Sequence, residues 1–146
     1  MSKVQAIPPQ YGSLTPYLVV PRCDKAIEFY KQAFDAEEVM RMPMPDGSVG
    51  HAELKIGDSI VMVASSNEEW PQTSALTCLY VDDCDAVFHR ALAAGAQEIE
   101  PLSDKFYGDR AGAIKDPFGQ RWSIMTHKED LSPEEMETRM AKMSAP

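Results

Sequence analysis

The stretch Phe106–Thr126, FYGDRAGAIKDPFGQRWSIMT, decides the fold because it holds two strand-like runs around a turn. In Asp116-Pro117-Phe118-Gly119 the aspartate suits the first position of a type I turn, the proline presets φ at the second, and the glycine suits the fourth. On either side of the turn, neighbouring side chains of a strand point to opposite faces of a sheet. The stretch therefore predicts a β-hairpin with one face in the core and one face free to hold a ligand.

The earlier part of the chain contains a pattern that is repeated just before this hairpin. Val20-x-x-Cys23-Asp24 recurs as Val81-x-x-Cys84-Asp85, and Ala36-x-Glu38-Val39 recurs as Ala96-x-Glu98-Ile99. Repetition at one long spacing indicates two copies of a supersecondary unit that pack together to bury their apolar faces. The strand and helix signals within each copy predict an α+β fold built from two βαβββ modules.

Turn residues and helix-capping signals set the boundaries of these modules. We expect a single domain over residues 1–146. Its parts are an irregular arm (1–14), a first βαβββ module (15–64), a loop (65–74), a second βαβββ module (75–127) and a C-terminal helix (132–143). Asp24 is expected to cap the first helix, and Gly95 to follow the end of the second. Ser132-Pro133-Glu134-Glu135 is a capping box that starts the last helix.

Composition restricts the partners and the cellular compartment. The chain has 146 residues, 44% of them hydrophobic, which is enough for one substantial core. Its net charge of −9 disfavours binding to nucleic acid or to anionic membrane surfaces. The three cysteines, Cys23, Cys78 and Cys84, form no CxxC motif, so neither a disulfide framework nor a zinc ribbon is predicted. With no secretory or membrane-spanning apolar segment, we expect a cytoplasmic protein with no membrane partner.

The two modules, together with TPYLVVPRCDKAIEFYKQAF (residues 15–34) and YGDRAGAIKDPFGQRWSI (107–124), resemble the vicinal oxygen chelate superfamily of glyoxalases, bleomycin-resistance proteins and extradiol dioxygenases. The stretches MRMPMPDGSVGHAELKIGDS (40–59) and THKEDLSPEEMETRM (126–140) are similar to its PhnB-like subgroup. The resemblance implies the glyoxalase/bleomycin-resistance fold, in which mixed, curled sheets enclose a concave site. It also implies a homodimer.

The resemblance further implies where a divalent metal would bind in an enzyme of this superfamily. The glyoxalase ligand positions fall on Thr15, Met62, Leu76 and Ser123 of this sequence. Leucine and methionine are unsuited to such an ion, and neutral hydroxyl groups are poor ligands for it. The usual metal site is therefore expected to be absent, and no cofactor is expected. A divalent metal remains an alternative at His51 and Glu53, which lie two apart on a predicted strand and project from one face.

Alternation along the strands selects side chains for a small-molecule site, which would combine aromatic and apolar groups with a few polar ones. Arg110 offers a guanidinium group to an anionic ligand, although an ion pair with an acidic side chain is an equally simple role. Catalytic residues stay unassigned. The candidate ligand-binding residues are Thr15, Tyr17, His51, Glu53, Leu76, Cys78, Tyr80, Tyr107, Arg110, Arg121 and Ser123.

Three functions fit these observations. The first is a PhnB-like protein that binds a small molecule in a cavity between curled sheets without the usual metal. The second is a divalent-metal-dependent lyase, isomerase or dioxygenase with relocated ligands around His51 and Glu53. The third is a non-catalytic interaction domain, because Met136, Met140 and Met143 form an apolar stripe on the C-terminal helix. Whether the protein is an enzyme stays open at this point.

Overall fold

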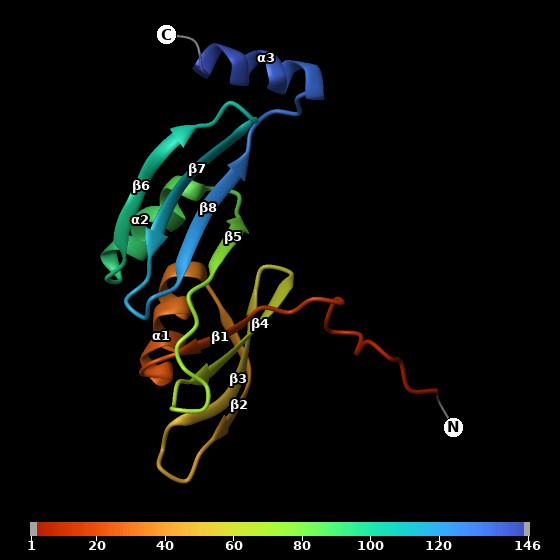
Figure 1. Cartoon of the computed structure of the whole chain (residues 1–146). Coiled ribbons are helices and arrows are strands. Elements are labelled where there is room, and N and C mark those ends of the chain that lie inside the picture. Colours follow the sequence, from red (N-terminus) through yellow and green to blue (C-terminus); the bar gives the residue numbers. More distant parts are fainter. Residues whose placement is uncertain (1–2, 145–146) are drawn as a thin grey trace. The chain divides into compact units, whose positions relative to one another are not determined.

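A computed structural model describes residues 3–144 of the chain (Figure 1). The chain forms two compact units. The first contains the chain up to Ala75 together with Pro117–Gln120, and the second contains Leu76–Asp116 and the chain from Arg121 onward. Each unit has one four-stranded mixed sheet and a helix packed on it. These elements confirm the predicted pair of βαβββ modules with a C-terminal helix.

The first unit contains the first βαβββ module. Its sheet has the strand order β1-β4-β3-β2, in which β1 runs parallel to β4 and the other neighbours are antiparallel. Both connections within the β2–β3–β4 meander are short. The elements are β1 (Tyr17–Val20), α1 (Cys23–Phe34), β2 (Glu37–Pro43), β3 (Val49–Ile56) and β4 (Ser59–Ser65).

Helix α1 covers one face of this sheet because its apolar residues recur at helical spacing. Ile27 and Tyr30 are completely buried, as are the strand residues Leu54 and Val63 that point toward the helix. Every second strand residue therefore faces α1, and no other helix of the described part of the first unit covers the opposite face of the sheet. The further buried helix residues are Cys23, Ala26, Phe29, Ala33 and Phe34.

The start of α1 corrects the prediction that Asp24 caps it. The helix begins at Cys23, and the capping position is Arg22, which has φ 50° and ψ 54° and makes no side-chain capping bond within the described chain. The backbone turns into the helix through this left-handed residue directly after Pro21, so Asp24 already lies in the first turn. There its carboxylate still suits the positive end of the helix dipole.

The turn between β7 and β8 provides side chains to the core of the first unit. Phe118 is 4% exposed, and its ring meets that of Phe29 edge-on at 6.2 Å between centroids. Gln120 is 1% exposed and donates from Nε2 to the Thr73 carbonyl at 2.6 Å. The short loop from Pro117 to Gln120 therefore has a buried, hydrogen-bonded structural role.

The second unit repeats the topology with the strand order β5-β8-β7-β6, again with one parallel pair, β5 and β8. Trp122, Ile124 and Ile114 form its core with Phe88 of the helix, each at most 2% exposed. Gly95 has φ 115° and follows the end of the helix as predicted. The elements are β5 (Leu76–Tyr80), α2 (Cys84–Ala93), β6 (Gln97–Asp104), β7 (Asp109–Lys115), β8 (Arg121–His127) and α3 (Pro133–Ser144).

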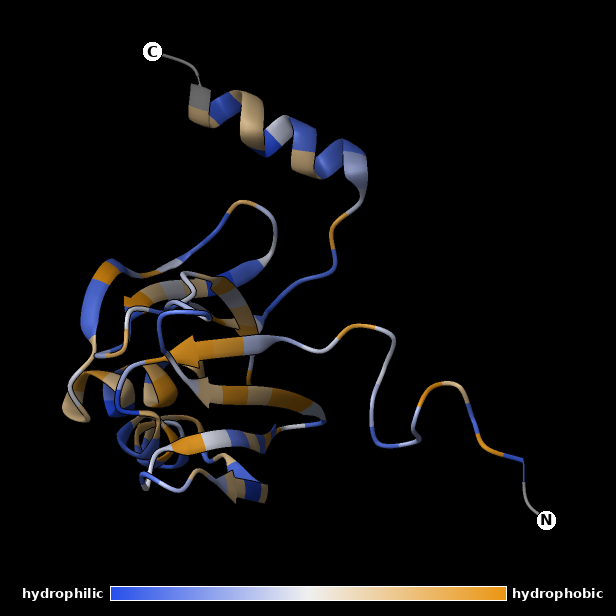
Figure 2. Ribbon diagram, turned by 60° about the horizontal axis from the view of Figure 1, so that its bottom comes forward, coloured by the Kyte–Doolittle hydropathy of each residue, from blue (hydrophilic) through white to orange (hydrophobic). Residues whose placement is uncertain are grey.

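Helix α3 is the predicted C-terminal helix, with the Ser132 hydroxyl accepting from the Glu135 amide at 3.2 Å. Figure 2 shows hydrophobic and hydrophilic residues in turn along it. Met136 is half-buried, whereas Met140 and Met143 are exposed. Within residues 3–144, no helix is long and apolar enough to cross a membrane.

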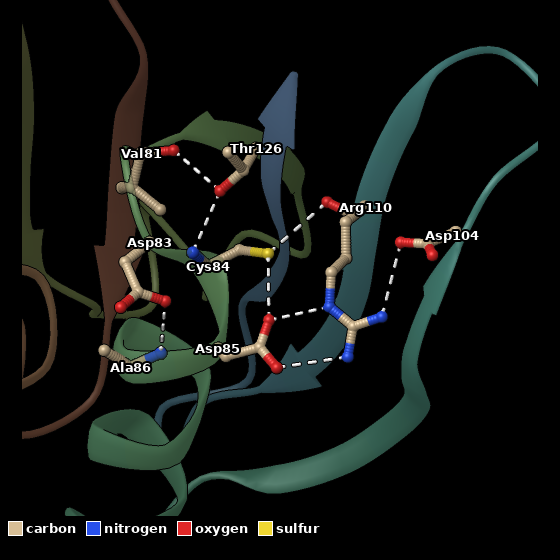
Figure 3. Close-up of polar contacts among 8 residues, drawn as sticks. All are labelled: Val81, Asp83, Cys84, Asp85, Ala86, Asp104, Arg110 and Thr126. Atoms are coloured by element: carbon tan, nitrogen blue, oxygen red, sulfur yellow. Dashed lines mark hydrogen bonds and ion pairs between the residues drawn. The ribbon is translucent and has the colours of Figure 1, made fainter. Parts of the chain in front are cut away.

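Unlike α1, helix α2 begins with a side-chain cap. The Asp83 carboxylate accepts from the Ala86 amide at 3.2 Å, and the Thr126 hydroxyl accepts from the Cys84 amide at 2.9 Å (Figure 3). We expect Asp83→Ala to lower the free energy of unfolding by about 1 kcal/mol, because one amide of the first turn loses its partner. Urea denaturation measures this. Asp24→Ala is the matched control, and a loss as large as that of Asp83→Ala would contradict the capping role.

Candidate functional site

The helix-free face of the first sheet brings four of its side chains together. The strand register places Tyr17 on β1 beside Met62 on β4, and Met62 beside Glu53 on β3. His51 lies two residues before Glu53 on the same strand and so projects from the same face. Tyr17, His51 and Glu53 are three of the predicted ligand-binding residues, and the fold makes them neighbours.

These side chains form one continuous chain of hydrogen bonds. The Tyr17 hydroxyl lies 2.9 Å from Nδ1 of His51, and Nε2 of His51 lies 2.9 Å from Oε2 of Glu53. The Tyr11 hydroxyl donates to the other carboxylate oxygen, Oε1. Glu53 is only 8% exposed, whereas Tyr17 is 44% exposed. The chain thus runs from a buried carboxylate to a phenol at the surface of this unit.

The electrostatics of the chain fix the direction of each hydrogen bond. The hydrogen bonds from Tyr11 and then from His51 lower the pKa of Glu53, so this carboxylate is ionised and can only accept. Nε2 of His51 therefore carries the hydrogen. In the neutral ring Nδ1 is then an acceptor, which makes Tyr17 the donor. Partial burial raises the pKa of Tyr17, so its phenol stays protonated.

Two residues that precede β1, Thr15 and Tyr11, have positions or contacts that the sequence did not predict. Thr15 was expected in the first strand, but β1 begins at Tyr17 and Thr15 lies in the preceding segment, half-buried. Proline at position 16 has no backbone donor, but its carbonyl accepts from the Met62 amide of β4 at 2.9 Å, and the paired residues begin with Tyr17. Tyr11 was not predicted, because it belongs to an arm without periodicity and reaches Glu53 through tertiary structure only.

The helix-free face of the second sheet also carries predicted ligand-binding residues. Leu76, Cys78 and Tyr80 alternate along β5, and the register places them beside Arg121, Ser123 and Met125 of β8. Leu76 and Tyr80 are 65% and 59% exposed, in contrast to the core residues on the other face. This unit therefore presents an apolar and aromatic strip next to the Ser123 hydroxyl and the Cys78 thiol.

A buried carboxylate that sequence reasoning did not select anchors the end of this face. Asp109 is 4% exposed and accepts from the Tyr80 hydroxyl at 2.6 Å through Oδ2. Its Oδ1 lies 2.7 Å from Nδ1 of His127, whose Nε2 lies 2.7 Å from Asp130. The bond to Asp109 raises the pKa of Tyr80 to about 12. His127 is therefore hydrogen-bonded on both sides of its ring, and Asp109 is its buried partner.

The His127 contacts predict a pH-dependent contribution to stability. The hydrogen bonds to Asp109 and then to Asp130 raise the pKa of His127 above its ordinary value. A raised pKa in the folded state stabilises the fold fully below the ordinary value near 6.5, and the gain is lost as pH rises through the folded value. We expect His127→Asn to lower the melting temperature more at about pH 5.5 than at about pH 8.5.

Melting curves of both proteins at the two pH values measure this difference. His89→Asn, at an exposed position of α2, is the control for losing a histidine. A loss at His127 that does not change between the two pH values would contradict the ion-pair contribution.

Arg110 lies on the opposite face of the second sheet. Its Nε and Nη2 donate to the two carboxylate oxygens of Asp85 at 2.7 and 3.1 Å, and Nη1 lies 3.4 Å from Asp104 (Figure 3). The guanidinium group lowers the pKa of Asp85. The ion pair that the sequence left as an alternative is present, and it turns Arg110 toward α2, away from Cys78 and Tyr80. Tyr107, the remaining candidate, lies in the β6–β7 connection, its ring edge-on to that of Phe106.

A pocket of about 290 Å³ lies in the second unit and shares only Asp109 with the helix-free face described above. Several of its charged groups already have partners: Lys105 pairs with Glu100, and Glu129 pairs with Arg139. Five of its six lining residues are of charged types, whereas ligand pockets are lined mainly by hydrophobic and aromatic side chains. The lining residues are Asp104, Lys105, Gly108, Asp109, Lys128 and Glu129. We therefore place the candidate site on the helix-free sheet faces.

The residues at the implied metal positions do not fit a metal. Met62 and Leu76 lack nitrogen and oxygen donors, and Thr15 and Ser123 offer only hydroxyl groups. His51 and Glu53 contact each other, and both nitrogens of His51 already have hydrogen-bond partners. Within residues 3–144, no group of three or more histidine, cysteine, aspartate or glutamate side chains is arranged to hold a metal ion.

Residues 11–124 match the family described as the Glyoxalase/Bleomycin resistance protein/Dioxygenase superfamily. The chain belongs to this superfamily. The match runs from Tyr11, which contacts Glu53, to Ile124 in β8, so it includes both modules. It confirms the resemblance seen in the sequence.

Several other proteins are similar to this chain in sequence or in fold. The uncharacterized protein Mb0911c of Mycobacterium bovis is 38% identical over 143 residues, covering 88% of this chain and 92% of its own length. The crystal structure of TioX from Micromonospora sp. ML1 is 28% identical with a TM-score of 0.67, covering 83% of this chain and 100% of TioX. A PhnB protein from Bacillus cereus, 22% identical, has the same fold with a TM-score of 0.61, covering 79% of this chain and 99% of its own.

Proposed function

We propose that the protein binds a small molecule against the helix-free faces of its two sheets, without the usual metal site of the superfamily. The observation that carries this proposal is the exposure of large aromatic and apolar side chains, Tyr17, Leu76 and Tyr80, on these faces. Tyr17 is hydrogen-bonded to His51 and Tyr80 to Asp109, and Leu76 lies beside Arg121 in the strand register, so polar groups accompany the apolar ones as in ligand sites.

The family supports a binding role that does not depend on turnover. The superfamily is named after a resistance protein as well as two classes of enzyme. Sharing its fold therefore does not by itself confer a reaction. We further propose that the two units act as one domain, that the protein forms a homodimer and that it works in the cytoplasm, where its three free cysteines stay reduced.

A ligand screen by thermal shift tests the proposal, because any molecule that binds only the folded state raises the melting temperature. The probes are bleomycin, inorganic phosphate, benzoate and Zn²⁺. We expect at least one organic probe to stabilise the protein, and expect Tyr17→Ala to reduce the shift. His89→Ala, at an exposed position of α2, should keep the full shift. A panel in which no organic probe raises the melting temperature would overturn the proposal.

The metal-dependent alternative rests on one observation, the convergence of His51 and Glu53 on one face of β3. Metal analysis of the purified protein separates it from the proposal above. One equivalent of a divalent ion that is lost in His51→Ala would establish the alternative. A protein without metal that still responds to an organic probe would support binding without it.

A further inference from the structure

We propose that Tyr17, His51 and Glu53 form a nucleophile–base–carboxylate triad, in which the Tyr17 phenol attacks an electrophilic acyl group of a bound ligand. This inference rests on the proposed function, because it assigns a chemistry to the ligand face of the first sheet. It names one class of ligand, esters and other activated acyl compounds.

The geometry is that of an activated nucleophile. A nucleophile and its base must lie within about 2.6–3.2 Å, and a third group must orient the base. Here the Tyr17 oxygen lies 2.9 Å from Nδ1 of His51, and Nε2 of His51 lies 2.9 Å from the Glu53 carboxylate. The ionised carboxylate holds the hydrogen on Nε2, so Nδ1 is free to take the phenolic proton. Glu53 thus has the role of the aspartate in serine hydrolases.

Exposure decreases from Tyr17 through His51 to Glu53, which is the order that this chemistry needs. The Tyr17 residue is 44% exposed, so that an electrophile can reach its oxygen, whereas the His51 and Glu53 side chains are 23% and 11% exposed. Tyr11 donates to the carboxylate oxygen that His51 does not use, and so completes the fixation of Glu53. Glu53 and Tyr11 act through His51 and are positioning residues. Tyr17 and His51 are the catalytic residues.

The step balances without a metal or a redox partner. The Tyr17 oxygen forms a bond to the acyl carbon, and its proton passes to Nδ1 of His51. The bond between the acyl carbon and the leaving oxygen breaks, and the leaving group departs as an anion. The imidazolium formed on His51 is stabilised by the Glu53 carboxylate until it returns the proton to water. The product is an ester of Tyr17.

Acetylation by p-nitrophenyl acetate tests the triad. The full-length protein is treated with the ester, and peptide mass spectrometry follows the acetyl group on each tyrosine with time. Tyr107, a half-buried tyrosine of the β6–β7 connection, is the comparison within the same molecule. We expect Tyr17 to react about 100-fold faster than Tyr107, because general-base assistance gives at least this factor.

The variants separate the triad from a structural hydrogen-bond chain. His51→Ala should reduce the Tyr17 rate to that of Tyr107, while His89→Ala should leave it unchanged. Glu53→Ala should slow acetylation, and Glu53→Asp should restore part of the rate because it keeps a carboxylate. Melting curves establish that each variant is folded. A Tyr17 rate equal to that of Tyr107, or one that survives in folded His51→Ala, would overturn the triad. The thermal-shift screen would stand in either case, because it does not depend on acyl transfer.

Discussion

Replacing Trp122 with alanine is expected to lower the free energy of unfolding by about 3–5 kcal/mol, the usual cost of emptying an aromatic site in a core. Trp122 is 1% exposed at the centre of the second unit, on the face of β8 that packs with Phe88 and Ile114. Its Nε1 also donates to Oδ2 of Asp116 at 3.0 Å, and Asp116 is itself only 3% exposed. The substitution thus removes volume and a buried hydrogen bond together.

Trp122→Phe separates the two contributions, because it keeps most of the ring volume and removes the indole donor. We expect its loss to lie near 1–2 kcal/mol, which is the scale of one buried hydrogen bond and a small void. Urea denaturation followed by circular dichroism measures both variants. Equal losses for alanine and phenylalanine would show that the hydrogen bond, and not the packing, dominates at this position.

Gly108→Ala is expected to be the second most destabilising change, with a loss of roughly 3 kcal/mol from backbone strain and a steric clash. Gly108 has φ 98°, a backbone conformation that residues other than glycine rarely adopt. An added Cβ would also collide with the backbone carbonyl of Glu129. The Gly108 carbonyl accepts from the Lys128 and Glu129 amides at 2.8 and 3.0 Å, so the clash cannot be relieved without loosening these bonds.

Gly47→Ala is the matched control, because Gly47 has a similar φ of 88° while a Cβ there would meet no atom within 4 Å in residues 3–144. It should lose only the cost of the positive φ, about 1–2 kcal/mol. Thermal or urea denaturation of both variants yields the difference. Equal losses of stability in the two variants would contradict a steric clash between the added Cβ and the Glu129 carbonyl.

Much of the fold could be predicted because its signals are local. The Asp116-Pro117-Phe118-Gly119 turn and the repeated motifs fix two modules, and Ser132 marks the start of α3. The start of α1 was predicted wrongly because Asp24 has the right side chain for a cap, while the left-handed backbone of Arg22 leaves no local sign in the sequence. A side chain's capping preference shows that it suits the start of a helix. It does not show at which residue the backbone enters the helix.

The candidate site was predictable only where its members lie on regular strands. His51 and Glu53 follow from alternation along β3, and the pairing of Tyr17 with them needs only the order of the strands. Tyr11 lies in the irregular arm and reaches Glu53 through tertiary structure, which no periodicity encodes. Asp109 is the first residue of β7 and pairs with His127 in the strand register, but its sequence does not show that Tyr80 of β5 would reach it. For Arg110, the sequence left both a ligand role and an ion pair open, and the position of Asp85 on α2 decides in favour of the pair.

The two halves of this duplicated chain use the same three kinds of group in a different order. In the first half a histidine stands between a phenol and a carboxylate, so a proton can travel through the middle member. In the second half the Asp109 carboxylate lies between Tyr80 and His127 and accepts a hydrogen bond from each of them. The two copies of the repeat therefore differ in what they can do: the first can pass a proton from a phenol to an imidazole, whereas the second holds Tyr80 and His127 together through one carboxylate.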